Sequence, residues 1–182
     1  MLLKHIITNQ CILPCQLQHR QYEGKMDIDK LNVLYKLFSQ KYESIILAGG
    51  KPTLESNFWH IAKTAAKYFK NIYLTTSNRL ALADPDYSIF TEIWFTGFQF
   101  TFPLVLNQAN AFAMVNANQF TERLPKYLVQ HGYKGLILYD RNEHFSALYQ
   151  GKELVVKTFC NSDVDQVLMP NLKVLVVNKP AA

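Results

Sequence analysis

Long apolar runs are missing from this chain of 182 residues, and none approaches the ~18 to 20 residues that a membrane-spanning helix needs. The opening residues, Met-Leu-Leu-Lys-His, do not have the form of a signal peptide. Basic runs are also missing, because no two Lys or Arg residues are adjacent, although the formal net charge is +5. Charge scattered in this way is typical of a solvated surface. The sequence therefore predicts a cytoplasmic protein without membrane attachment.

Cysteine is scarce, since the chain has only three. An odd number of cysteines in a chain without an export signal argues against a disulfide framework. We expect three free thiols in the cell, with no disulfide between Cys11 and Cys15. These two cysteines remain available as a metal-binding or redox pair.

Internal repeats of about 20 to 50 residues and low-complexity segments are absent as well. The composition is that of an ordinary globular protein, with 49% hydrophobic and 18% charged residues. A chain of this length can bury a core of its own, so we expect a single domain over residues 1–182. No RNP, zinc-finger or helix-turn-helix signature accompanies the net positive charge, which makes nucleic acid an unfavoured partner.

The most informative stretch covers residues 45–78. Residues 45–48 form a short apolar run that ends at Gly49 and Gly50. A helical pattern follows over residues 53–69, and an apolar strand pattern over residues 71–78. This order and length predict a right-handed β-α-β unit, and hence parallel strands.

The alternation of strand and helix continues to about residue 140. It predicts an α/β fold with a mostly parallel sheet, arranged as a partial (β/α)6 unit like part of a TIM barrel. The expected strands of this part span residues 2–8, 45–48, 71–78, 88–95, 111–116 and 135–139, and the expected helices span residues 27–41, 53–69 and 119–132.

Residues 141–182 have a different pattern and predict a β-rich C-terminal tail. Residues 147–159 are expected to form a β-hairpin with its turn at Gly151. Residues 164–168 are expected to form a helical turn, and residues 172–177 a last strand. The single domain would thus consist of β/α repeats followed by a hairpin and a terminal strand.

Helix starts and core positions can also be predicted. Asp27 and Thr53 are candidate N-caps of the first two helices, because a short oxygen-bearing side chain accepts hydrogen bonds from free backbone N–H groups. Gly132 is a candidate C-cap of the third helix. Strand centres are expected to be buried, at Leu3, Ile6, Ile45, Leu47, Ile72, Leu74, Trp94, Met114, Leu136 and Leu138.

Gly49 and Gly50 mark the first candidate site. A glycine lets the backbone approach a ligand where a side chain would block it. In parallel α/β sheets, ligands bind at the carboxyl ends of the strands. We therefore expect a ligand near the end of the strand that these two glycines terminate.

Three stretches carry a resemblance to a known family. Residues 6–15 read Ile-Ile-Thr-Asn-Gln-Cys-Ile-Leu-Pro-Cys, residues 48–54 read Ala-Gly-Gly-Lys-Pro-Thr-Leu, and residues 74–78 read Leu-Thr-Thr-Ser-Asn. Over about residues 2–78 the chain resembles the radical S-adenosylmethionine superfamily. That family has a Cys-x3-Cys-x2-Cys loop after its first strand, Gly-Gly-Glu-Pro after its second and Thr-Asn-Gly after its third.

The resemblance implies a small member of that superfamily, with S-adenosylmethionine and a [4Fe-4S] cluster as its cofactors. Cys11 and Cys15 would then bind the cluster iron. The residues that would meet the methionine end of the cofactor are Gly49, Gly50, Lys51 and Pro52. Thr76 and Asn78 would lie near its ribose.

The chain departs from the family at two positions. Gln18 stands where the family has its third cysteine, and an amide is a poor iron ligand. His19, one residue later, is the near substitute, and Cys160 is a more distant one. Lys51 stands where the family has glutamate, and a cation beside the cofactor amine would cost affinity through like-charge repulsion.

These departures favour a non-catalytic or accessory relative that binds a partner protein, a peptide or a small molecule at the barrel mouth, with or without S-adenosylmethionine. The alternative is an active radical enzyme whose cluster is held by Cys11, Cys15 and a non-standard third ligand such as His19. A basic nucleic-acid-binding domain is the third hypothesis. Whether the chain is an enzyme stays open at this point.

Overall fold

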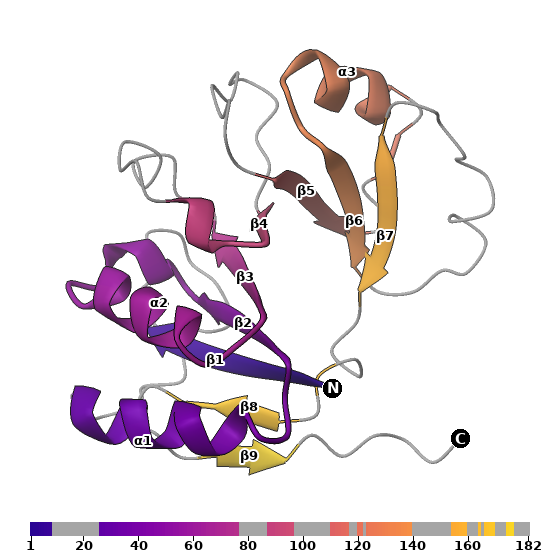
Figure 1. Ribbon diagram of the computed structural model, residues 1–182. Helices are drawn as coiled ribbons and strands as arrows, with labels where there is room; N and C mark the ends of the chain where they lie inside the picture. Colours follow the sequence, from indigo (N-terminus) through magenta and orange to yellow (C-terminus); the bar gives the residue numbers. More distant parts are fainter. Residues whose placement is uncertain are drawn as a thin grey trace.

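The computed structural model describes most of the chain, and Figure 1 shows its course. The described residues are 1–8, 26–76, 87–96, 110–116, 120–121, 123–139, 154–159, 164, 166–169 and 174–176. None of the helices in these ranges is long and apolar enough to cross a membrane.

Nine strands and three α-helices make up the described part. In chain order they are β1 (Leu2–Thr8), α1 (Ile28–Phe38), β2 (Ser44–Gly49), α2 (Phe58–Ala66), β3 (Asn71–Thr76), β4 (Glu92–Phe95), β5 (Ala111–Asn116), α3 (Leu124–Gln130), β6 (Gly135–Tyr139), β7 (Val155–Phe159), β8 (Gln166–Leu168) and β9 (Val174–Val176). Two short 3-10 helices, Pro52–Leu54 and Tyr87–Ile89, precede α2 and β4.

All nine strands belong to one sheet, in the order β7-β6-β5-β4-β3-β2-β1-β8-β9. Each neighbouring pair from β1 to β7 is parallel, β8 is parallel to β1, and only β9 runs antiparallel to its neighbour. The edges of the sheet are β7 and β9. The structure therefore confirms the predicted α/β fold, a mostly parallel and open relative of a TIM barrel with a β-rich C-terminal tail.

The tail differs from the prediction in how its strands pair. The segment expected as the second arm of a hairpin is β7, which pairs in parallel with β6 and extends the parallel sheet. The expected first arm and Gly151 lie outside the described residues. The helical turn expected over residues 164–168 is wrong, because Gln166–Leu168 is a strand paired with Leu3–His5 of β1. A segment of three residues carries too short a pattern to separate a helical turn from a strand.

The first two helices begin differently. At the start of α1, the Asp27 side chain accepts a hydrogen bond from the Lys30 backbone N–H at 3.1 Å, as predicted. The predicted cap at Thr53 is wrong, because Thr53 lies inside the 3-10 helix Pro52–Leu54. Glu55 has extended backbone angles and separates this turn from α2, which starts only at Phe58.

The third helix starts at Leu124, with Pro125 in its first turn, where a missing N–H costs little. Gly132 follows it with a φ of 79°, the left-handed conformation expected of a C-cap glycine. Figure 1 shows α1 and α2 beside the β1–β3 half of the sheet, and α3 beside the β5–β7 half.

The two faces of the sheet have separate apolar clusters. The larger cluster joins the helices to the sheet and includes Leu3, Ile45 and Leu74. The smaller cluster lies on the opposite face, which we call the inner face, and receives no residue from the three α-helices. All the predicted core residues are buried except Met114, which is half-buried because it lines a cavity on the inner face.

Candidate functional site

The inner face holds a cavity of about 370 Å³. Strand alternation explains it, since every second residue of β1 to β7 points away from the helices. The described residues that line it are Lys4, Ile6, Ile46, Ala48, Gly49, Thr75, Thr96, Met114, Val115, Asn116, Tyr139 and Phe159. Several of them stand at the carboxyl ends of β2 to β7, the side at which parallel α/β sheets bind ligands.

Gly49 sits at this end of β2 and has a φ of 139°. A Cβ atom placed there would lie 2.3 Å from the Thr8 carbonyl oxygen at the end of β1. The neighbouring Gly50 N–H donates a hydrogen bond to the same oxygen at 2.9 Å. The lack of a side chain at Gly49 is thus required by the close approach of two strand ends, and Gly49 also forms part of the cavity wall.

The other described residues of the predicted cofactor site gather around the same strand ends. Lys51 and Pro52 are buried, and the 3-10 helix that Pro52 begins contacts β1, β2 and β3. Thr76 is buried at the end of β3, and its carbonyl oxygen accepts a hydrogen bond from the Thr96 N–H at 2.9 Å. The fold therefore brings Gly49, Gly50, Lys51, Pro52 and Thr76 together at the carboxyl ends of β2 and β3.

The predicted cluster ligands cannot be placed in the same way. Cys11, Cys15 and His19, together with Gln18, Asn78 and Cys160, lie outside the described residues. Within the described ranges, no group of three or more His, Cys, Asp or Glu side chains is arranged to hold a metal ion. The iron-sulfur site remains a prediction from the sequence.

Lys4 is the one charged side chain among the described residues of the cavity lining. It lies in the middle of β1, between Ile46 of β2 and Val167 of β8. Burial lowers the pKa of its amine from the ordinary value. The sequence reasoning missed Lys4, although the alternation of β1 between helix face and inner face could have indicated it.

The adjacent residue of β1, His5, points to the helix face instead. Its Nδ1 lies 2.5 Å from the Tyr35 hydroxyl of α1, and its Nε2 is buried without a hydrogen-bond partner among the described residues. Burial lowers the pKa of His5 to about 3 and raises that of Tyr35. His5 is therefore a neutral core residue on the opposite side of the sheet from the cavity.

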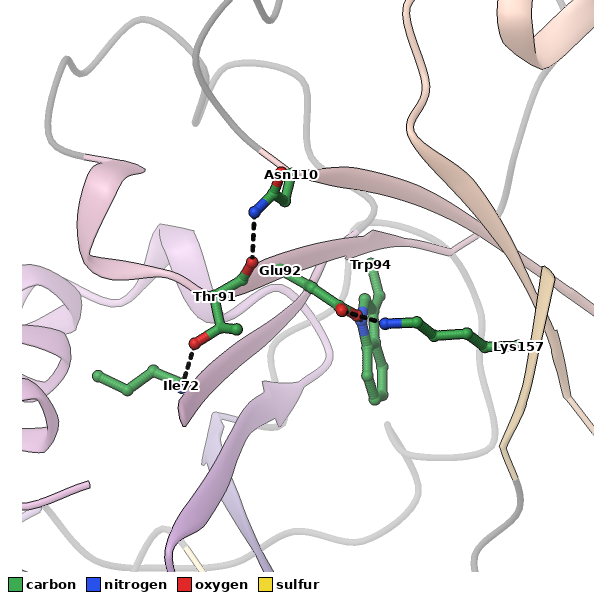
Figure 2. A network of polar contacts seen from close by, with 6 residues as sticks. All are labelled: Ile72, Thr91, Glu92, Trp94, Asn110 and Lys157. Atoms are coloured by element: carbon green, nitrogen blue, oxygen red, sulfur yellow. Dashed lines mark hydrogen bonds and ion pairs between the residues drawn. The ribbon is translucent and has the colours of Figure 1, made fainter. Parts of the chain in front are cut away.

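A polar network crosses the inner face from β4 to β7 (Figure 2). Glu92 forms an ion pair with Lys157 and accepts a hydrogen bond from the Trp94 indole N–H at 2.9 Å. The Lys157 amine also lies 4.7 Å from the centre of the Phe112 ring. Burial, and then the charge of Glu92, raise the pKa of Tyr73. The network links strands that are not neighbours in the sheet.

No protein-family model matches the chain, and no curated protein sequence matches it. Solved structures do match. The crystal structure of Streptococcus suis SuiB bound to S-adenosylmethionine superposes with a TM-score of 0.66 at 9% identity, over 96% of this chain and 57% of that one. BtrN in complex with AdoMet and 2-DOIA gives a TM-score of 0.40 at 14% identity, over 96% and 71%. That second TM-score is too low to carry an argument.

The likeness to SuiB concerns the fold alone, because so low an identity says nothing of individual residues. It shows that the α/β fold with a mostly parallel sheet, which the sequence predicted, is shared with SuiB. The chain spans little more than half the length of the SuiB chain.

Proposed function

We propose that this chain is a small-molecule-binding relative of the radical S-adenosylmethionine fold, without radical chemistry of its own. The observation that carries the proposal is the cavity of about 370 Å³ that reaches the carboxyl ends of the strands. Its volume falls in the range of roughly 300 to 1,000 Å³ that is typical of ligand pockets. Apolar walls with a few polar groups are also typical of such pockets.

S-adenosylmethionine is the first ligand to test, because the matched SuiB structure was solved with it bound. Gly49, Gly50 and Thr76 stand at the strand ends where the resemblance places this cofactor. Lys51 fits it less well. S-adenosylmethionine carries a sulfonium and an amine against one carboxylate, so a buried cation at the mouth repels its net charge.

Calorimetric titration with S-adenosylmethionine tests this assignment. We expect measurable binding by the wild-type protein and severalfold tighter binding by Lys51→Glu, since that change removes a repulsive charge and adds an attractive one. Lys70→Glu, at an exposed position before β3, is the matched control and should leave the affinity unchanged. Absence of binding by both wild type and Lys51→Glu would reject this ligand.

The absence of radical chemistry has its own test. After anaerobic reconstitution with iron and sulfide, we expect little bound iron and no 5′-deoxyadenosine from reduced protein and S-adenosylmethionine. If 5′-deoxyadenosine forms, and the Cys11→Ala and Cys15→Ala variants abolish it, the chain is an enzyme and the proposal is overturned. A protein or peptide partner at the same mouth stays a prediction from the sequence.

A further inference from the structure

We propose that the ion pair of Glu92 and Lys157 is a latch that holds β7 against the inner face and keeps the wall of the cavity closed. The inference goes beyond the proposed function, because it concerns how the cavity is closed and not which ligand the cavity takes. The latch joins β4 to β7 across β5 and β6, the two strands that lie between them in the sheet. It therefore links two parts of the inner face that are not neighbours in the hydrogen-bonded ladder.

The side chain of Lys157 crosses the inner face to reach its partner. Lys157 lies opposite Ile137 of β6, which lies opposite Met114 of β5. The Lys157 amine lies over the Phe112 ring, 4.7 Å from its centre, and meets the carboxylate of Glu92, the first residue of β4. Figure 2 shows the two ends of this ion pair. One side chain of β7 thus spans the two middle strands.

The space for this crossing depends on Gly135 of β6. A Cβ atom at this position would collide with the Phe112 ring and with the Val155 carbonyl oxygen of β7. Because glycine has no side chain, the Phe112 ring can lie close to the β6 backbone, with the Lys157 amine over its face. Phe112 and Gly135 therefore leave a path for the lysine side chain between β7 and β4.

The two ends of the latch have different environments. Glu92 is buried and also accepts the hydrogen bond of the Trp94 indole N–H, so this end is held in place. The Lys157 side chain is 43% exposed and belongs to an edge strand of the described sheet, so water competes for its amine. An ion pair with an exposed partner contributes less free energy than a buried pair. The latch can therefore open by release of Lys157 to water while the sheet stays folded.

Phe159 connects the latch to the cavity. Its ring lines the cavity, and it lies two residues after Lys157, on the same face of β7. The Phe159 ring packs on Trp94, with 5.1 Å between the ring centres, and Trp94 is buried. Outward movement of β7 would carry Phe159 away from Trp94, which would open the cavity wall and expose the indole to water. Trp94 therefore reports the state of the latch.

Acrylamide quenching of Trp94 fluorescence tests the latch. The chain has two tryptophans, so a Trp59→Phe background leaves Trp94 as the single emitter. Trp59 lies on α2 beside the other apolar cluster, and phenylalanine keeps an aromatic ring there. In this background we expect weak quenching, and a severalfold larger quenching constant after Lys157→Met. Lys157→Arg keeps the charge and should keep Trp94 protected.

Glu92→Gln separates a latch from simple packing. Glutamine keeps the size of the side chain and an oxygen that can accept the Trp94 hydrogen bond, and it removes the charge that holds Lys157. A latch predicts quenching close to that of Lys157→Met, whereas a packing role predicts quenching close to that of the parent. Lys134→Met, at an exposed position before β6, is the matched control and should leave quenching unchanged. Far-UV circular dichroism identifies the variants that are folded.

Two results would overturn the inference: a protected Trp94 in folded Lys157→Met, or a protected Trp94 in Glu92→Gln. If Lys157→Met does not fold, Glu92→Gln decides alone. The titration with S-adenosylmethionine is a separate measurement. If S-adenosylmethionine does not bind and quenching follows the series, the latch stands and only that ligand is rejected. If S-adenosylmethionine binds and Trp94 stays protected in both variants, the latch falls and the proposed function stands.

Discussion

The buried pair of His5 and Tyr35 predicts a specific dependence of stability on pH. His5 is 0% exposed and its Nδ1 meets the Tyr35 hydroxyl at 2.5 Å, between β1 and α1. No described side chain offers a partner to His5 Nε2, so a protonated ring would place an uncompensated charge in the apolar core. Burial accordingly lowers the pKa of His5 from 6.5 to about 3.

The direction of the effect follows from the difference in proton binding between the two states. Below pH 6.5 the unfolded chain takes up a proton on His5, whereas the folded protein does not until the pH approaches 3. Stability is therefore fully present above pH 6.5 and is lost as the pH falls through this window. Between pH 7.5 and pH 5, this group alone should lower the free energy of unfolding by about 2 kcal/mol.

Two variants isolate this contribution. Tyr35→Phe keeps His5, whereas the double variant His5→Leu/Tyr35→Phe removes the titrating ring without leaving a buried hydroxyl alone. Urea unfolding of both at pH 7.5 and pH 5 should show a larger loss of stability for the single variant, by about 2 kcal/mol. His60→Gln, at an exposed position on α2, should behave as wild type. Equal pH dependence of Tyr35→Phe and the double variant would refute the reasoning.

Two further changes test the site and its frame. Gly49→Ala should lower the free energy of unfolding, measured by urea titration, by about 2 to 4 kcal/mol. The alanine would have to adopt a φ of 139°, and its Cβ atom would lie 2.3 Å from the Thr8 carbonyl oxygen. Gly132→Ala, with a φ of 79° at a helix end, should cost only about 1 kcal/mol in the same titration. Lys157→Met should cost about 1 to 2 kcal/mol, because it leaves the Glu92 carboxylate with the Trp94 hydrogen bond but without its counter-charge. The cost is smaller than for a fully buried pair, because the Lys157 side chain is 43% exposed. Adding Glu92→Gln should restore most of the loss, and an additive double variant would show that the pair does not couple.

The strands could be predicted from the sequence because both faces of the parallel sheet carry an apolar cluster. Strands that are buried on both faces appear in the sequence as short, continuous apolar runs. β5 and β6 have the predicted bounds, and β1 likewise. The pairing partners of the C-terminal strands could not be predicted. Three-residue strands such as β8 carry no periodicity, and which edge of the sheet they join depends on contacts between segments far apart in the chain.

The candidate site was predictable only in part. Glycine and proline at the end of β2 are visible in the sequence because they change the backbone locally. Lys4, Glu92 and Lys157 have no such local signature, because what makes them notable is their shared position on the inner face. The pair Glu92 and Lys157 belongs to strands separated by two others, and only the curvature of the sheet brings their side chains together.

The place of β8 has a consequence for how the chain folds. β1 precedes the other eight described strands along the chain, yet one of its two neighbours, β8, lies more than 150 residues further on, with Leu3 opposite Gln166. Until that late segment arrives, the backbone N–H and C=O groups along one side of β1 face no strand, and such an edge can pair with other chains. Closing so long a loop is also entropically costly, which slows the completion of the sheet. Of the strands β1 to β6, the one that carries Lys4 is therefore the last to gain both of its neighbours during synthesis.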